Sequence, residues 1–90
     1  MKLTAADRQS FIEAHPDWAL HDESISRTFV FDGFTQAIAF VVEVGFLSEA
    51  ADHHPDIDIR WNKVTIVLST HSEVALTEKD SALAAQFDEI

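Results

Sequence analysis

The amino-acid sequence predicts an α+β domain in which three helices pack on one face of a four-stranded antiparallel sheet, in the order α-β-β-α-β-β-α. Apolar and polar residues alternate from Ile25 to Phe31, which is the period of a β-strand. The apolar segment from Phe34 to about Asp52 is long enough to be a helix. Capping-box patterns at Thr4 and Thr77 mark the starts of two further helices.

The first helix is predicted from the capping box Thr4-Ala5-Ala6-Asp7. It should end at His15-Pro16, because proline disfavours the helical conformation of the residue before it. Phe11 and Ile12 are expected to form its buried side. A brief strand, Trp18 to Leu20, is expected to follow.

The second strand is predicted from the alternation that starts at Ile25. Ile25, Arg27, Phe29 and Phe31 share one side of it, and the residues between them share the other. Asp32-Gly33 ends this strand and precedes the long helix.

The long helix is apolar on two sides. One stripe contains Phe34, Ile38, Val41 and Gly45, and a second contains Phe40, Val44, Leu47 and Ala51. Such a helix must be covered on more than one side, yet a domain of this size offers only one sheet. The second stripe therefore predicts a subunit interface made by Phe40, Val44 and Leu47, and the alternative is a central helix in a monomer.

The remaining segments predict a hairpin and a last helix. Ile57, Ile59 and Trp61 alternate with polar residues, and Val64, Ile66 and Leu68 continue the apolar face on the return strand. Asn62-Lys63 is predicted to be the two-residue turn between them, because Asn tolerates positive φ. The last helix, which starts at Thr77, is expected to bury its stripe of Leu83, Phe87 and Ile90.

Composition narrows the class of function. The 90 residues are expected to form a single domain, residues 1–90, and 16 acidic against 6 basic residues give a formal net charge of −10. Such a charge repels phosphate backbones, so no direct nucleic-acid partner is expected. The chain has no cysteine, no signal-peptide pattern and no uninterrupted apolar run long enough to cross a membrane. We therefore expect a cytoplasmic protein without a membrane partner.

Histidines at the predicted ends of elements are the candidates for chemistry. His53-His54-Pro55 follows the long helix, His71 follows the last strand, and Asp80 lies in the first turn of the last helix. Imidazole transfers protons near neutral pH and also binds metals. Adjacent side chains such as His53 and His54 point in different directions and are poor ligands for one ion, although a zinc site with His71 and Asp80 is an alternative. The structural alternative is that His53 caps the helix, His54 lies on the surface and Asp80 only completes a capping box.

The spacing of these residues resembles the signature of the pterin-4a-carbinolamine dehydratases. The matching residues are Glu49, His53, His54, Pro55, Trp61, His71 and Asp80. Upstream, Trp18 and the run Arg27, Phe29, Phe31, Phe34, Ala37 and Phe40 also resemble that family. The resemblance extends from Trp18 to the C-terminus.

This resemblance implies a hydro-lyase that converts 4a-hydroxytetrahydrobiopterin to quinonoid dihydropterin and water, in tetrahydrobiopterin recycling. His53, His54 and His71 carry over as catalytic residues, with His54 and His71 as the proton-transfer pair and His53 as a positioning residue. Glu49, Pro55, Trp61 and Asp80 carry over as supporting or substrate-binding residues. The family implies no metal, no cofactor and a homodimer or homotetramer. The alternative is a non-catalytic dimerisation or assembly cofactor on the same fold.

The loop after His71 departs from the family pattern. Members of the family have glycines there, whereas this chain has Ser72, Glu73, Val74 and Ala75. Because Val74 and Ala75 lack glycine's access to positive φ, the loop is expected to follow a different path.

Overall fold

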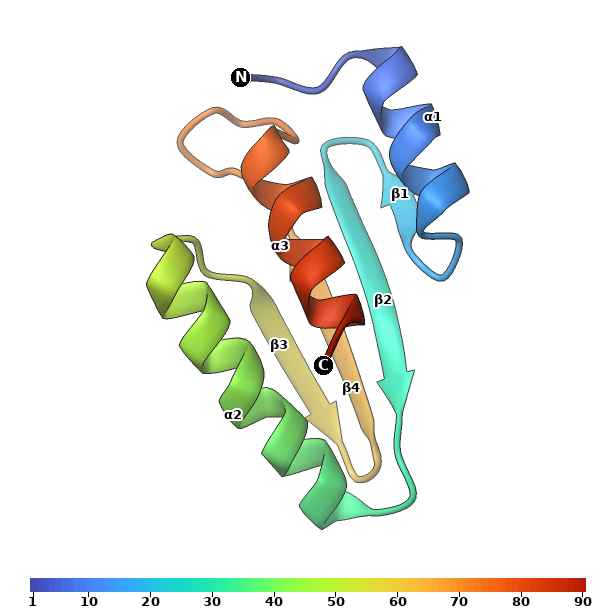
Figure 1. Cartoon of the computed structure of the whole chain (residues 1–90), viewed down its shortest axis with the longest axis vertical. Helices are drawn as coiled ribbons and strands as arrows, with labels where there is room; N and C mark the ends of the chain where they lie inside the picture. Colours follow the sequence, from blue (N-terminus) through green and yellow to red (C-terminus); the bar gives the residue numbers. More distant parts are fainter.

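A computed structural model describes all 90 residues of the chain and confirms the predicted order of elements (Figure 1). The elements are α1 (Ala5–Ala14), β1 (Ala19–His21), β2 (Ser24–Val30), α2 (Phe34–Ala51), β3 (Asp56–Arg60), β4 (Lys63–Leu68) and α3 (Glu78–Asp88). Both predicted capping boxes are present: Thr4 caps α1 and Thr77 caps α3.

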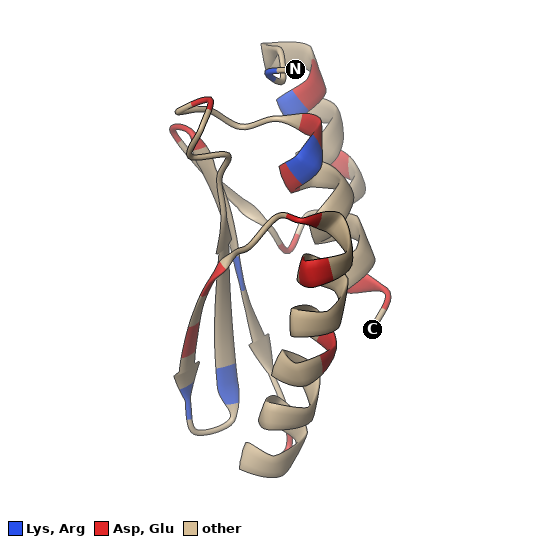
Figure 2. Ribbon diagram, turned by 90° about the vertical axis from the view of Figure 1, so that its left-hand side faces the viewer, with Lys and Arg blue, Asp and Glu red and all other residues tan.

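The four strands form one antiparallel sheet in the order β1-β2-β4-β3. The two long central strands, β2 and β4, pair from Ile25 opposite Leu68 to Val30 opposite Lys63. The helices lie on one side of the sheet and leave its other side uncovered, as Figure 2 shows. The predicted α+β class with helices on a single face is therefore confirmed.

The hydrophobic core lies between the central strands and the two helices α2 and α3. It includes Ile25, Phe29, Val64, Ile66 and Leu68 from the sheet, Ala37, Phe40 and Val44 from α2, and Leu83, Ala84 and Phe87 from α3. Phe40 and Val44 are buried within the subunit, so the prediction that they form a subunit interface was wrong. Both stripes of α2 are apolar, and periodicity alone could not say which one faces the sheet.

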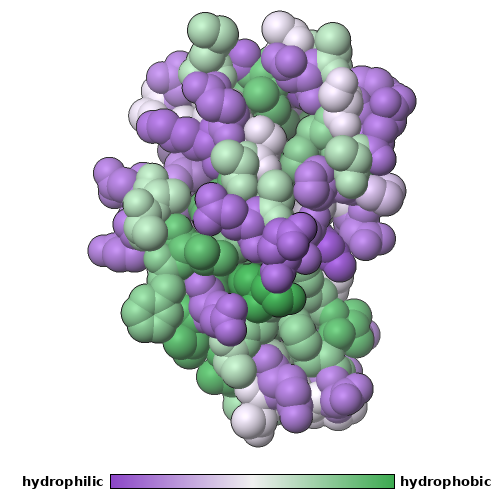
Figure 3. All heavy atoms as spheres, in the orientation of Figure 1, coloured by the Kyte–Doolittle hydropathy of each residue, from purple (hydrophilic) through white to green (hydrophobic).

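The outward face of α2 is the apolar surface that the chain leaves unpartnered. We define it by Val42, Gly45, Phe46 and Glu49, which follow the helical spacing i, i+3, i+4 and i+7. Val42 is 53% exposed and Phe46 is 73% exposed. Apolar side chains gather over this part of the molecule in Figure 3. By length and composition α2 could also cross a membrane, but its other side packs into the core of the domain.

The β3–β4 turn lies one residue earlier than predicted. Arg60 pairs with Lys63, so the two turn residues are Trp61 and Asn62. Trp61, and not Asn62, has positive φ, at 53°. Asn62 instead is tied to the end of β2, where its Nδ2 donates to the carbonyl of Phe31 at 2.9 Å.

The carboxylate of Asp88 joins α1 to the rest of the domain. It accepts hydrogen bonds from Trp18 Nε1 at 2.8 Å and Arg27 Nη1 at 2.7 Å, and it lies 2.7 Å from Nδ1 of His15. This network matters because α1 itself has no fully buried residue; Phe11 and Ile12 are only half-buried. Ile90, predicted to be buried, is 44% exposed beyond the end of α3.

Candidate active site

The centre of the candidate site is a buried imidazole–carboxylate pair. Nε2 of His53 lies 2.5 Å from Oδ1 of Asp80. The Asp80 side chain is 0% exposed, and that of His53 is 11% exposed. A buried carboxylate needs hydrogen-bond donors around it, because an unpaired buried charge is strongly unfavourable.

The start of α3 and the segment after β4 supply the other donors to Asp80. Oδ2 of Asp80 accepts from the backbone N–H of Thr77 at 3.0 Å and from the hydroxyl of Thr70 at 2.8 Å. The Thr77 hydroxyl lies 2.7 Å from that of Thr70 and can donate to it, which makes a chain of bonds that ends on the carboxylate. Thr70 comes from the end of β4, where it pairs with Ala75 across a short loop. Three elements therefore fix the position of Asp80.

The carboxylate of Asp80 determines which nitrogen of the neutral His53 ring carries the proton. An ionised carboxylate only accepts hydrogen bonds, so Nε2 of His53 carries the proton that lies between the ring and Asp80. Nδ1 of the neutral ring is then left as an acceptor. This is the arrangement in which a carboxylate orients an imidazole so that the second ring nitrogen can accept a hydrogen bond or a proton.

A second, exposed pair lies beside the first. Nε2 of His54 lies 2.8 Å from Oε1 of Glu49 on the last turns of α2. The side chains are 59% and 82% exposed, respectively. Asp52, with φ of 50°, ends the helix in the left-handed region and redirects the chain, so that His53 turns inward and His54 outward. Pro55 is half-buried at the entry to β3.

His71 is the third imidazole of the group and comes from a different connection of the chain. It follows Thr70 in the loop between β4 and α3 and is exposed. His53, His54 and His71 all line one hollow of about 260 Å³, together with Asp52, Ser69, Thr70, Ser72 and Lys79. The three imidazoles that the sequence singles out therefore share a single surface depression. No three or more His, Asp or Glu side chains converge in metal-binding geometry, so the zinc alternative has no structural support.

Trp61 is the predicted site residue that the subunit does not bring to this hollow. It lies in the β3–β4 turn, at the opposite end of β3 from His53 and His54 (Figure 1). Its side chain is 69% exposed. Within one subunit, Trp61 cannot contact a molecule bound between the imidazoles.

Lys79 and Thr70 belong to the site but were not predicted. Lys79 is the only lysine or arginine that lines the hollow, and it lies in the first turn of α3. A cation there is unfavourable to the helix dipole, which prefers acids at the N-terminal end. That conflict was the one signal in the sequence that pointed to Lys79.

The glycine-free loop reaches positive φ despite its sequence. Val74 has φ of 50°, and its N–H donates to the carbonyl of His71 at 3.2 Å. The structure therefore contradicts the premise that Val74 has no access to positive φ. A β-branched residue in the left-handed region is strained by about 1–2 kcal/mol, and the flanking pair of Thr70 with Ala75 holds it there.

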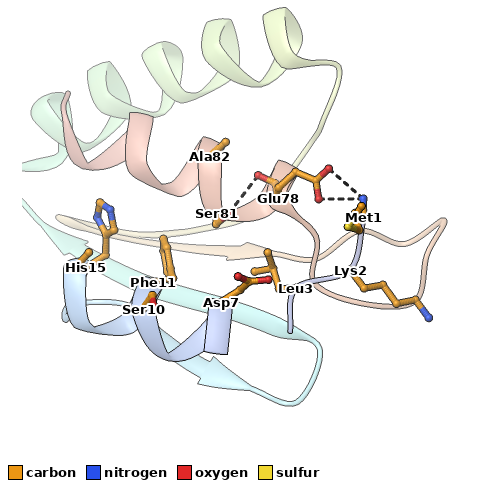
Figure 4. A pocket seen from close by; sticks show the side chains of 11 residues that line it. Met1, Lys2, Leu3, Asp7, Ser10, Phe11, His15, Glu78, Ser81 and Ala82 are labelled. Atoms are coloured by element: carbon orange, nitrogen blue, oxygen red, sulfur yellow. Dashed lines mark hydrogen bonds and ion pairs between the residues drawn. The ribbon is translucent and has the colours of Figure 1, made fainter. Parts of the chain in front are cut away.

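The largest hollow of the molecule lies elsewhere. It measures about 550 Å³ and runs between α1 and the start of α3, where the N-terminal ammonium pairs with Glu78 (Figure 4). Its one imidazole, His15, is paired with Asp88. This hollow is therefore lined by a single imidazole, whereas three imidazoles line the smaller one.

The fold and site define a small α+β protein in which three imidazoles line one hollow and two of them are paired with carboxylates. Comparison with known proteins agrees with this class. Residues 1–90 match the family described as Pterin 4 alpha carbinolamine dehydratase. The chain is 53% identical to a Chloroflexus aurantiacus protein that bears the provisional name pterin-4-alpha-carbinolamine dehydratase, over 99% of this chain and 96% of that protein. A Roseiflexus castenholzii protein with the same provisional name is 60% identical over 81% of this chain and 78% of its own length. The chain therefore belongs to the pterin-4a-carbinolamine dehydratase family.

Two solved structures share the fold. The crystal structure of a transcriptional coactivator/pterin dehydratase from Brucella melitensis superposes with a TM-score of 0.94, at 31% identity, over 99% of this chain and 97% of that one. A pterin dehydratase-like protein identified as a RuBisCO assembly factor in the alpha-carboxysome superposes with a TM-score of 0.66, at 26% identity, over 80% of this chain and 83% of that one.

Proposed function

We propose that the protein catalyses the dehydration of 4a-hydroxytetrahydrobiopterin to quinonoid dihydropterin, as part of tetrahydrobiopterin recycling. The observation that carries this proposal is the buried pair of His53 with Asp80, which borders the hollow that His54 and His71 also line. A protein with no chemistry to perform has no evident need for a desolvated carboxylate that orients an imidazole toward a surface depression.

The reaction needs two proton movements and no change of oxidation state. The bond between C4a and its hydroxyl oxygen breaks, the oxygen takes up a proton and leaves as water, and a ring nitrogen loses a proton as the carbon–nitrogen double bond forms. One imidazolium and one neutral imidazole supply these steps. We assign them to His54 and His71, which line the same hollow from the α2–β3 and β4–α3 connections. His53, held by Asp80, positions the substrate by accepting a hydrogen bond at Nδ1.

A stopped-flow assay on 4a-hydroxytetrahydrobiopterin tests this function, with the pterin generated by an aromatic amino-acid hydroxylase. The wild-type protein should accelerate dehydration well beyond the uncatalysed rate. His71→Ala should lower kcat by about 10²-fold or more, as expected for loss of a general acid or base. His21→Ala is the matched control, because His21 lies in β1 outside the site, and it should keep full activity. Wild-type turnover equal to the uncatalysed rate would exclude the proposal.

The second candidate is a non-catalytic assembly role on the same fold. It is favoured by one observation, the structural similarity to the carboxysome assembly factor. The assay just described separates the two, because an assembly factor has no dehydratase activity for His71→Ala to remove.

We also propose that the protein forms a homodimer or homotetramer through the outward face of α2. Gly45 supports this: a Cβ added there would meet no atom within 4 Å, so the subunit itself does not need a glycine. Glycine inside a helix costs about 1 kcal/mol relative to alanine, and close approach of another helix is a reason to keep it. The face carries no Lys or Arg that would favour an anionic membrane surface instead.

Light scattering after size exclusion tests the assembly. The wild-type protein should be oligomeric at micromolar concentration, and a strict monomer would contradict the proposal.

We propose a cytoplasmic location on the basis of the net charge and the absence of cysteine, and cell fractionation tests it.

A further inference from the structure

Two buried threonine hydroxyls lie behind the Asp80 carboxylate, and their hydrogen bonds have a single possible direction. An ionised carboxylate only accepts hydrogen bonds, so the Thr70 hydroxyl donates its proton to Oδ2 of Asp80 at 2.8 Å. Thr70 can then only accept from the Thr77 hydroxyl, which lies 2.7 Å away. The Thr77 oxygen in turn accepts from the backbone N–H of Lys79 at 3.2 Å. We call this directed chain, from Thr77 through Thr70 to Asp80, the hydroxyl relay.

The hydroxyl relay is shielded from water. Thr70 is 4% exposed, Thr77 is 1% exposed and Asp80 is 0% exposed. In such a place each donor stabilises a negative charge more than it would at the surface, and no water replaces a donor that is lost. Together with the N–H of Thr77 and the N-terminal end of the α3 dipole, the relay therefore favours the ionised form of Asp80.

The ionised form of Asp80 decides whether Nδ1 of His53 is free. With Asp80 ionised and the ring neutral, the shared proton lies at Nε2 and Nδ1 is an acceptor. The pair can take up one more proton as an imidazolium beside a carboxylate, or as a carboxylic acid that donates to Nε2. Both forms place a hydrogen on Nδ1. Loss of a donor to Asp80 favours them, because it destabilises the state in which the pair carries a net negative charge.

We propose that the hydroxyl relay keeps Nδ1 of His53 free of hydrogen at neutral pH, so that this nitrogen can accept a hydrogen bond from the bound pterin. Thr70 and Thr77 are thus positioning residues, which act through Asp80 and His53. Their role in catalysis rests on the proposed dehydratase activity. The protonation state of the ring is a property of the free protein, however, and can be measured without a substrate.

Other charged and titratable groups surround His53 and act on the same ring. The hollow that His53 lines is also lined by Asp52, His54, His71 and Lys79. Glu49 is bonded to His54, and Glu78 precedes Lys79 in the first turn of α3. These groups are the same in the wild-type protein and in a threonine variant. Comparison of the two proteins therefore isolates the effect of the hydroxyl.

The test is NMR of the histidine ring nitrogens, recorded as a function of pH for the wild type, Thr70→Val and Thr70→Ser. Nitrogens with and without a hydrogen have separate resonances, and the His53 signals are those absent from His53→Asn. In Thr70→Val, Nδ1 should take up its proton at a pH about one unit higher than in the wild type, the scale of one hydrogen bond to a charged group. Thr70→Ser keeps the hydroxyl and should restore the wild-type titration.

Thr65→Val is the matched control. Thr65 lies on β4, and its hydroxyl also pairs with that of another threonine, Thr28, at 2.8 Å, but this pair is exposed. The same substitution there should leave the titration of the His53 ring unchanged. Should circular dichroism show that Thr70→Val is unfolded, Thr77→Val provides the same test. It removes the donor to Thr70 but not the donor to Asp80, so its shift should be smaller and in the same direction.

The dehydratase assay adds a measurement that simple destabilisation would not reproduce. At neutral pH, Thr70→Val should lose up to about tenfold in kcat/KM relative to the wild type. This difference should disappear as rising pH removes the extra proton from Nδ1.

Three results would overturn the inference. They are a His53 titration in Thr70→Val that equals the wild-type one, an equal shift in Thr70→Ser, and a loss of kcat/KM that persists at high pH. The second would assign the effect to side-chain packing and not to the hydroxyl. Failure of the proposed function is distinct from all three, because it appears as absent turnover in the wild-type protein whatever the ring titration shows.

Discussion

Nε2 of His53 lies 2.5 Å from Oδ1 of Asp80, although the two residues are 27 positions apart in the sequence. Asp80 is also the acid of the capping box that starts α3. One oxygen of the carboxylate therefore serves the helix and the Thr70 hydroxyl, while the other holds the imidazole. The structure confirms that Asp80 completes a capping box, and because the side chain has two oxygens it also pairs with His53; its part in catalysis stays a prediction.

We predict that Asp80→Asn lowers both stability and activity. The amide has one acceptor oxygen instead of two, so it cannot accept from His53, Thr70 and the Thr77 N–H together. The free energy of unfolding should fall by about 1–3 kcal/mol, the usual cost of an unsatisfied buried group. The kcat of dehydration should fall by about 10²-fold, because the tautomer of His53 is no longer fixed. Urea denaturation and the stopped-flow assay measure the two effects.

Glu78→Gln is the control for Asp80→Asn. Glu78 is an acid in the same helical turn, but its side chain is exposed and bonded only to the N-terminal ammonium. Its loss should leave kcat within about twofold of wild type, since exposed pairs contribute little. If Asp80→Asn keeps wild-type kcat, Asp80 is only a structural cap.

Lys79→Gln should separate stability from function. Removing a cation from the first turn of α3 relieves its conflict with the helix dipole, so stability should rise by about 0.3–1 kcal/mol. The same change removes the only Lys or Arg from the hollow, and KM for the pterin should rise by up to about tenfold, the value of one hydrogen bond. Thermal denaturation and steady-state kinetics on one preparation provide both numbers. A KM equal to that of the wild type would place Lys79 outside the binding site.

Glu23 should contribute to stability in a pH-dependent way. A hydrogen bond from the Arg8 side chain lowers the pKa of Glu23 below its ordinary value of 4.5. A carboxyl whose pKa is lower in the folded state stabilises the fold above the unfolded value and loses that effect as pH falls through the folded value. Glu23→Gln should therefore have a lower Tm than wild type at pH 7, and the difference should shrink as the pH falls below 4.5 and through the lowered pKa of the folded state. A difference that persists unchanged at acid pH would contradict this origin.

Local patterns in the sequence were sufficient to predict most of the helices and strands. The capping boxes at Thr4 and Thr77 depend on side chains three residues apart, and strand alternation depends on neighbours, so both are visible without tertiary information. The orientation of α2 was not, because Phe40 and Phe46 are equally apolar and only packing decides that Phe40 faces the sheet.

The sequence was sufficient to name the histidines that line the candidate site, but not to predict how their side chains are arranged in space. Adjacent residues point in different directions, so the sequence could not say whether His53 or His54 meets Asp80. Trp61 shares the sequence signature with the histidines, yet β3 carries it to the far end of the sheet. Long-range placement of this kind depends on strand length and pairing, which no local pattern encodes.

The last prediction concerns the strained loop beside His71. Val74 is 80% exposed and does not line the hollow, so its side chain contributes little packing to offset its positive φ. Val74→Gly should therefore raise the free energy of unfolding by about 1 kcal/mol, because glycine adopts this conformation without strain. Val74→Ala should gain less, since alanine keeps a Cβ. Dehydratase activity should stay within about twofold of wild type, because the native backbone path is the one that glycine would take. Denaturant titration of the two variants measures the effect; a loss of stability in Val74→Gly would mean that the Val74 side chain, despite its exposure, supports the loop.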